Sequence, residues 1–228
     1  MNRERIGNIR DSDSSRAATQ RPWLWVLNMA VKLLLISLMI FSVTAPDLPQ
    51  FTGKAMTVRA LTYPLPVLLI PVLWWLRGRP PPYPHLLDAL IALPFLIDVA
   101  GNATNLYNTW RYFDDIAHFC NWVSLTVAFG AIMVSLPIGR LNAAALVVGF
   151  GASTHVLWEI AEYLVMRLGS SGLQLTYEDT IGDLAFSFCG SLVGALIAVT
   201  LLWGRSYVNP VLFGTKATQP AEEAEVPK

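Results

Sequence analysis

Acidic residues and histidines interrupt several long apolar stretches of this chain. They form four groups, each within or beside a run of Leu, Ile, Val, Ala and Phe: Asp98 with Asn102; Asp114 and Asp115 with His118; His155 with Glu159 and Glu162; and Asp179 with Asp183. Within a bilayer, one ionisable side chain costs about 2.5–3.5 kcal/mol on insertion scales. Groups of this size therefore indicate residues that have polar partners or a chemical function.

The spacing within the groups places their members on one face of a helix. Asp98 and Asn102 are four residues apart, as are His155 and Glu159, and Glu162 follows three residues later. Residues three, four or seven apart return to nearly the same side of a helix with 3.6 residues per turn. In a membrane, such a polar stripe must face other helices or a water-filled cavity.

The chemistry that these residues could share is the binding of a divalent cation. Seven carboxyl groups cannot all ionise in one low-dielectric site unless protons or cations neutralise them, and the nearby bases are the two histidines and the peripheral Arg111 and Arg167. Carboxylates with imidazole suit Mg²⁺, Mn²⁺, Fe²⁺ or Zn²⁺. The predicted metal ligands are Asp114, Asp115, His118, Glu159, Glu162, Asp179 and Asp183, with Asp98, Asn102 and His155 in supporting positions and with Glu159, Glu162 and Asp183 as candidates for a catalytic role.

Several of these residues also have a structural interpretation. Asp114, Asp115 and Asp179 fall where helices are expected to begin, and a carboxylate there can cap a helix and complement its dipole. His155 can be a neutral core histidine bonded to a serine or a carboxylate. Glu159 and Glu162 lie inside an apolar helix, where no capping role exists, so they argue most strongly for a functional site.

The composition is that of a membrane protein with several spans. Hydrophobic residues make up 54% of the 228 residues, charged residues make up 14%, and the mean hydropathy is +0.47. Such a chain is too apolar for an ordinary soluble domain. The net charge is zero and no dense basic tract occurs, which excludes nucleic acid as a partner and leaves membrane lipids. The GxSxG, Walker, dinucleotide-binding and HExxH motifs are absent, which weakens the commoner enzyme classes.

Six apolar stretches are long enough to cross a bilayer, which needs about 20 residues. They cover residues 23–43, about 60–76, 85–106, 115–137, 142–167 and 180–203. The predicted fold is therefore an all-α polytopic transmembrane helix bundle over residues 23–204. The polar tails on either side, residues 1–22 and 205–228, are expected to be disordered and cytoplasmic.

The last four stretches are expected to form a four-helix unit with a polar core. The first two carry no comparable polar stripe and are expected to flank that unit. Asp88, near the start of the third stretch, is expected to cap a helix or to lie at the membrane interface. Small residues on the last two stretches predict close helix packing there; they include Gly149, Gly151, Gly190 and Gly194.

The distribution of basic residues predicts the orientation in the membrane. Eleven of the 16 Lys and Arg residues fall in segments on the same side as the termini, whereas four, Lys54, Arg59, Arg111 and Arg167, fall on the other side. The positive-inside rule then places both termini in the cytoplasm. All four polar groups lie toward the opposite, extracytoplasmic ends of their helices, so they are expected to share one depth and one site.

Three ordered motifs resemble those of the YjdF-like bacterial inner-membrane proteins. They are Asp-Asp-Ile-Ala-His-Phe at 114–119, Trp-Glu-Ile-Ala-Glu-Tyr at 158–163, and Tyr-Glu-Asp-Thr-Ile-Gly-Asp-Leu at 177–184, followed by Gly190 and Gly194. The resemblance covers about residues 85–203. It implies a multi-pass protein of the bacterial inner (plasma) membrane and supplies no reaction.

Three functional hypotheses fit these observations. The first is a divalent-metal site open to the extracytoplasmic face that acts on a lipid or envelope substrate, with the metal activating water or polarising a phosphoryl or carbonyl group. The second is a proton- or cation-coupled transporter whose carboxyls titrate during transport. Against transport, the six stretches show no obvious inverted repeat and the polar residues gather on one side. The third is a non-catalytic membrane scaffold in which the cluster only fixes helix packing.

Overall fold

The described part of the chain is a bundle of helices. The computed structural model describes residues 22–170, 172–173 and 175–204, and within these ranges every regular element is helical. Six helical segments there are long and apolar enough to cross a membrane. The predicted all-α polytopic bundle with six spans is thereby confirmed. The predicted tails, residues 1–22 and 205–228, lie outside the described residues apart from Pro22.

The spans follow one another with short connections. The first is α2 (Pro22–Thr44), and the second consists of α3 (Met56–Thr62) and α4 (Pro64–Leu76). The third is α5 (His85–Ala103), which the short α6 (Leu106–Thr109) follows. The last three are α7 (Phe113–Met133), α8 (Arg140–Arg167) and α9 (Tyr177–Ile197), and α9 continues into the π-helix η1 (Ala198–Leu202).

The second span is longer than the apolar run in the sequence indicates. It begins at Met56 instead of near residue 60, and Tyr63, between α3 and α4, keeps helical dihedral angles (φ −64°, ψ −29°). Pro64 is tolerated at the start of α4 because its missing N–H falls in a first turn. The extra turn brings Arg59 inside the span, which matters for the polar site described below.

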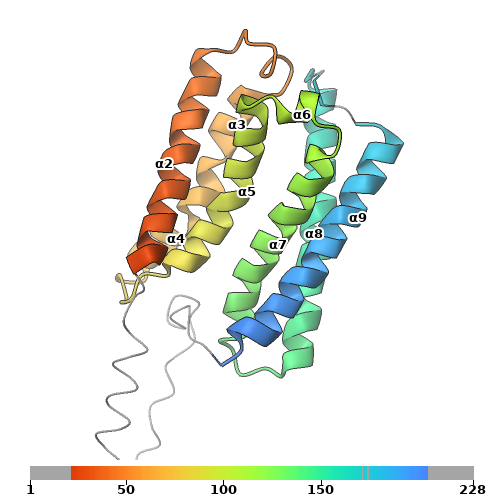
Figure 1. Ribbon diagram of the computed structural model, residues 1–228. Helices are drawn as coiled ribbons and strands as arrows, with labels where there is room; N and C mark the ends of the chain where they lie inside the picture. Colours follow the sequence, from red (N-terminus) through yellow and green to blue (C-terminus); the bar gives the residue numbers. More distant parts are fainter. Residues whose placement is uncertain (1–21, 171, 174, 205–228) are drawn as a thin grey trace, which may run out of the picture.

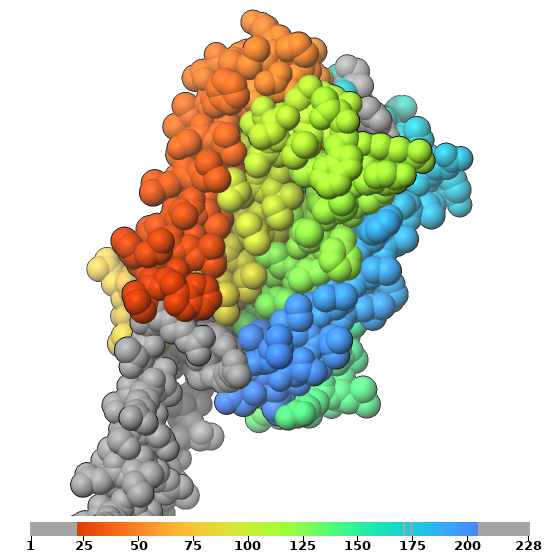
Figure 2. Space-filling model, viewed as in Figure 1, coloured from red at the N-terminus to blue at the C-terminus, as the bar shows by residue number. Residues whose placement is uncertain are grey.

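The helices form two groups that meet along α5 and α7 (Figure 1). α2 and α4 pack against α5, whereas α8 and α9 pack against α7. In the space-filling view, α5 and α7 are visible between α2 and α9 (Figure 2). The start of α2 and the end of η1 lie at one end of the bundle, as an even number of spans requires (Figure 1). The connection at 45–55, α6 and the α8–α9 connection lie at the other end, which we call the α6 end.

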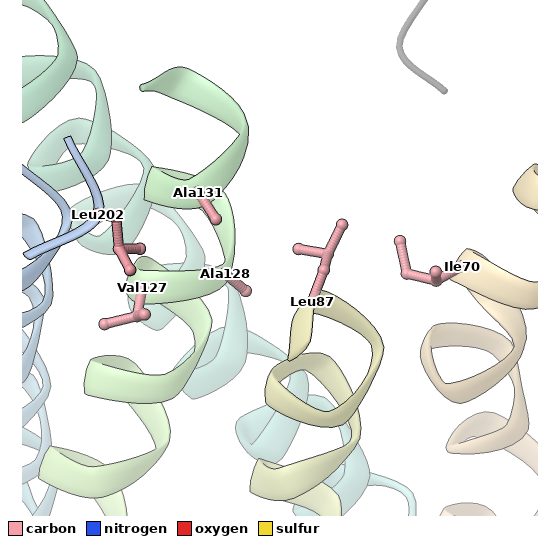
Figure 3. Packing of buried hydrophobic residues seen from close by; sticks show 6 residues of the cluster. All are labelled: Ile70, Leu87, Val127, Ala128, Ala131 and Leu202. Atoms are coloured by element: carbon pink, nitrogen blue, oxygen red, sulfur yellow. The ribbon is translucent and has the colours of Figure 1, made fainter. Parts of the chain in front are cut away.

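Apolar clusters pack the interior in two places. One cluster joins α4, α5, α7 and η1 and contains Ile70, Leu87, Val127, Ala128, Ala131 and Leu202 (Figure 3). The other lies nearer the α6 end and contains Leu35, Phe51, Met56, Tyr63 and Val99. Lipid tails are as apolar as these side chains, so close packing and polar contacts, more than the hydrophobic effect, decide which helices meet.

Polar contacts join the first span to the third, contrary to the expectation that the first two spans lack polar residues of this kind. Lys32 Nζ on α2 lies 2.6 Å from Asp88 Oδ2 on α5. Asn28 and Tyr83 donate hydrogen bonds to the same oxygen at 2.8 and 2.6 Å. Asp88 is 1% exposed. Asp88 therefore does not cap α5, whose N-cap position is Pro84, and is instead the buried counterion of Lys32.

α7 and α9 come closest where α9 has glycine. A Cβ atom at Gly190 would overlap the carbonyl oxygen of Phe119, and one at Gly194 would overlap the side chain of Thr126. The missing side chains thus let the two backbones meet, as small residues do in membrane helix pairs. Gly149 on α8 differs, because a Cβ there would meet nothing within 4 Å. The expectation of close packing is wrong at that position.

Gly190→Val is expected to separate α7 from α9 and to lower the free energy of unfolding by about 1–3 kcal/mol, the usual cost of overpacking. The measurement is unfolding of the purified protein by SDS in mixed micelles. Gly149→Val is the matched control, since it makes the same change in a helix but faces open space; we expect a shift within about 0.5 kcal/mol. Equal losses in the two variants would contradict the close approach of α7 and α9.

Candidate functional site

A polar cavity of about 410 Å³ lies at the α6 end of the bundle. α3, α5, α6, α7, α8 and α9 all contribute to its walls, together with the α8–α9 connection. The charged and imidazole side chains that line it are Lys54, Arg59, Asp98, Arg111, Asp114, His118, Glu162 and Asp179. The volume lies in the range of small-molecule sites. The polar lining suits a charged or hydrated ligand.

His118, on α7, lies at the centre of the acidic residues. Its Nε2 is 3.7 Å from Asp114 Oδ1 and 3.7 Å from Asp183 Oδ1. Its Nδ1 is 3.8 Å from Glu159 Oε1 and 3.1 Å from the hydroxyl oxygen of Ser187. Carboxylates thus face both nitrogens of one imidazole ring, and these nitrogens are the atoms through which histidine binds metals.

The structure brings five of the seven predicted ligands together in two overlapping triads. Asp114, His118 and Asp183 form one triad, and His118, Glu159 and Glu162 form the other. In each triad, one potential ligand atom per residue lies within 4.8 Å of the others. A cation about 2.0–2.6 Å from each ligand atom would hold them at comparable separations.

Glu159 is a buried carboxylate of these triads that has no hydrogen bond among the described residues. It is 7% exposed, and neither side-chain oxygen has a hydrogen-bond partner within the described part of the chain. An unpaired buried acceptor costs about 1–3 kcal/mol, and more when it is charged. A bound cation would satisfy both oxygens.

The first turns of α7 and α9 place the remaining predicted ligands. Asp179 lines the cavity, whereas Asp115 lies against Gly182 of α9 and belongs to neither triad. The N-cap of α9 is Thr176, whose hydroxyl accepts a hydrogen bond from the Asp179 amide at 3.1 Å. The N-cap position of α7 is Tyr112. Asp114, Asp115 and Asp179 therefore lie in the first turns of their helices, but none of them occupies an N-cap position.

His155 lies one turn before Glu159 on α8, outside both triads. The ring of Trp122 stacks on His118 at 5.6 Å between centroids and lies 6.1 Å from the ring of His155. The Nδ1 atom of His155 is buried and has no hydrogen-bond partner within the described residues. The contact of His155 with the triads is thus indirect, through Trp122.

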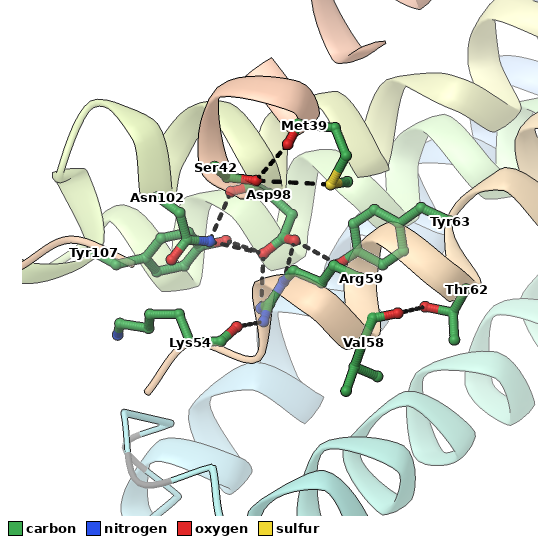
Figure 4. A network of polar contacts seen from close by, with 10 residues as sticks. All are labelled: Met39, Ser42, Lys54, Val58, Arg59, Thr62, Tyr63, Asp98, Asn102 and Tyr107. Carbon is green, nitrogen blue, oxygen red and sulfur yellow. Dashed lines mark hydrogen bonds and ion pairs between the residues drawn. The ribbon is translucent and has the colours of Figure 1, made fainter. Parts of the chain in front are cut away.

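Asp98 has the most complete set of partners of the acidic residues (Figure 4). Arg59 donates to both of its oxygens, from Nε at 2.7 Å and from Nη2 at 3.2 Å. Tyr63 donates to Oδ2, and Tyr107 and Asn102 each donate to Oδ1 at 3.3 Å. Asp98 is therefore the counterion of Arg59, and Asn102 supports Asp98 instead of a triad residue.

Arg59 is the site residue that sequence reasoning misses. Its position before the apolar run places it in an extracytoplasmic connection, but the span begins at Met56, and Arg59 is 9% exposed. Its guanidinium also donates to the carbonyl oxygen of Lys54. The available signal is an arginine directly before an apolar run, since charges at membrane depth usually pair with one another.

Two side chains that line the cavity outside the spans have shifted pKa values. Burial and the Asp98 carboxylate raise the pKa of the Tyr107 hydroxyl well above its usual range. Tyr107 therefore stays protonated and remains a hydrogen-bond donor. Burial, and to a smaller extent the positive charge of Arg59, lower the pKa of Lys54, whose Nζ lies 5.8 Å from the centre of the Tyr107 ring.

These features define a polytopic α-helical membrane protein with an acidic cavity at one end of its bundle. The chain belongs to the family described as predicted membrane protein (DUF2238), whose model matches residues 27–204. No curated protein and no solved structure matches the chain. Membership of a membrane protein family is thus established, whereas the YjdF-like resemblance and a bacterial origin stay predictions.

Arg59→Met is expected to leave Asp98 as an uncompensated buried charge and to lower the free energy of unfolding by about 3–5 kcal/mol. The double variant Arg59→Met/Asp98→Leu removes both charges and should recover most of that loss. Arg111→Met is the control, because this arginine is exposed and its guanidinium lies over the ring of Tyr112. SDS unfolding provides the measurement, and a double variant no more stable than Arg59→Met would disprove the pairing.

Proposed function

We propose that this protein binds a divalent cation among the acidic residues around His118 and uses it for a hydrolytic reaction. The ligands would come from Asp114, His118, Glu159, Glu162 and Asp183. The observation that carries the proposal is Glu159, whose two oxygens are buried beside the His118 ring and have no hydrogen-bond partner within the described chain. Carboxylates with one imidazole suit Mg²⁺, Mn²⁺, Fe²⁺ or Zn²⁺.

The cavity would supply the other parts of such a reaction. A bound cation would polarise a phosphoryl or carbonyl group and lower the pKa of a water molecule. Asp179 lines the cavity but belongs to neither triad, so its carboxylate is free to accept a proton as general base. Lys54 and Arg111 line the same cavity and would attract an anionic group of the substrate.

The orientation of the bundle would place this reaction on the extracytoplasmic face. The cavity lies at the α6 end, opposite the end where α2 begins. Eleven Lys and Arg residues belong to the tails and segments on the side of the termini, against four on the other side, and positive charge favours the cytoplasmic side. We therefore place both termini in the cytoplasm and the protein in the bacterial inner membrane, acting on a lipid or another envelope substrate.

The distribution of polar groups favours an enzyme over a transporter. α5 carries buried carboxylates at Asp88 and Asp98, but its buried residues between them are Ala89, Ala92 and Pro94. An ion that moved along α5 from one end of the bundle to the other would thus meet an apolar stretch, where its desolvation is costly. Solute uptake into vesicles that responds to a pH gradient would overturn this preference.

Metal analysis of the protein, purified in mild detergent without chelators, tests the site directly. We expect about one equivalent of divalent metal in the wild type, and its loss in His118→Ala, which removes the imidazole ligand, and in Glu159→Gln, which replaces an anionic ligand with a neutral amide. Glu178→Gln is the control, since Glu178 is exposed in the first turn of α9. A wild-type protein that neither retains metal nor takes it up on dialysis would rule out the site.

Thermal unfolding separates the metal site from a scaffold role. In chelator, Glu159→Gln should be at least as stable as the wild type, because it removes an uncompensated buried charge without changing the shape of the side chain. With metal at about 100 times its Kd, the wild type should gain about 2.7 kcal/mol and the variant should gain little. A Glu159→Gln protein that is strongly destabilised even in chelator would instead support a purely structural role.

A further inference from the structure

A smaller, apolar groove adjoins the polar cavity on one side. Its volume is about 80 Å³, and it lies between α3 and α8. The residues that only the groove contains are Ala55, Val58, Thr62, Tyr63, Ala161 and Val165. The residues that line both spaces are Arg59, Trp158, Glu162 and Leu173. The cavity therefore has an apolar extension beside Glu162, a member of one triad.

The groove opens between two membrane spans near the α6 end of the bundle. Its two walls belong to the spans Met56–Leu76 and Arg140–Arg167. Val58 is 41% exposed and Ala161 is also exposed, and Val58 points away from the Asp98 network (Figure 4). The exposed surface of a membrane span meets lipid tails. An alkyl chain is therefore the ligand chemistry that this groove fits.

The charges of the cavity fit an anionic group beside that alkyl chain. The described residues that line the cavity include three cationic side chains, Lys54, Arg59 and Arg111, and four carboxylates, Asp98, Asp114, Glu162 and Asp179. A divalent cation at the triads, which also contain Glu159 and Asp183, would nearly balance these carboxylates, so an anionic group would depend on direct contact with the metal, Lys54 and Arg111. Lys and Arg side chains together with a metal ion are the usual partners of phosphate oxygens.

We infer that the substrate is a membrane lipid with a phosphate head group that enters from the side of the bundle. Its alkyl chain lies in the α3–α8 groove, and its phosphate lies in the cavity near Lys54 and Arg111. The inference rests on the proposed function and names the substrate class of the same site. Such a lipid reaches the triads without leaving the bilayer, whereas a water-soluble phosphate ester would leave the apolar groove unused.

Photo-crosslinking in phosphatidylcholine vesicles tests the groove. The probe is a small fraction of phosphatidic acid with a diazirine in its acyl chain, and the readout is labelling of α3 and α8. Ala161→Phe fills the groove and should lower this labelling about tenfold, or about 1.4 kcal/mol. Ala145→Phe makes the same change at an exposed position of α8 outside the groove and should not alter it. Val58→Phe, from the opposite wall, replaces Ala161→Phe if that variant does not fold.

A diacylglycerol with the same diazirine chain tests the phosphate. It should label α3 and α8 several-fold less than phosphatidic acid does, and Lys54→Gln with Arg111→Gln should remove most of that difference. Equal labelling by the two lipids, or displacement of the probe by inorganic phosphate alone, would overturn a lipid phosphate as the ligand.

Metal content measured on the same samples distinguishes the two proposals. Protein that contains metal but labels equally with and without Ala161→Phe would overturn the lipid inference and leave the metal site intact. Protein that lacks metal yet labels in a groove-dependent manner would overturn the proposed function while the lipid site stands. Metal-containing protein whose labelling falls in Ala161→Phe and not in Ala145→Phe supports both.

Discussion

The need to compensate buried carboxylates in a bilayer determines how this bundle is assembled. α5 carries two such groups, Asp88 and Asp98, and each pairs with a cation from an earlier span, Lys32 of α2 and Arg59 of α3. Hydrocarbon gives one helix little preference for another, so polar contacts of this kind select neighbours that apolar surfaces do not. The two ion pairs hold α2 and α3 beside α5, and the Arg59–Asp98 pair forms part of the cavity wall.

The buried carboxylates of α7, α8 and α9 have less compensation from side chains than those of α5. The ion pairs that Asp114, Glu159 and Asp183 form within the described residues all involve His118. One imidazole, which carries at most a single positive charge, cannot neutralise several carboxylates. The penalty that Lys32 and Arg59 remove on α5 therefore remains on α7, α8 and α9 unless protons or another cation remove it. A divalent cation provides more charge in less space than any side chain, which is why we favour it.

The sequence predicts the spans well because span length and hydropathy are local properties. The clustering of His118, Glu159 and Asp183 also follows from helical spacing and the alternating direction of the spans. Asp115 is outside the triads because neighbouring residues on a helix point about 100° apart, so it cannot share the direction of Asp114. Lys32 and Asp88 are 56 residues apart, and no local pattern pairs them. Arg59 is missed for another reason, since the start of a helix is the least certain part of any assignment from sequence.

Arg59 contributes both to the assembly of the bundle and to the walls of the candidate site. Its guanidinium neutralises Asp98, and its side chain also lines both the polar cavity and the apolar groove. The ion pair that helps to assemble the first half is thus part of the surface that a ligand would contact. Because Asp98 already occupies this guanidinium, Lys54 and Arg111 are the cations in the cavity that are left to meet an anionic group. In the proposed site, Arg59 would thus hold the fold, and Lys54 and Arg111 would contact the ligand.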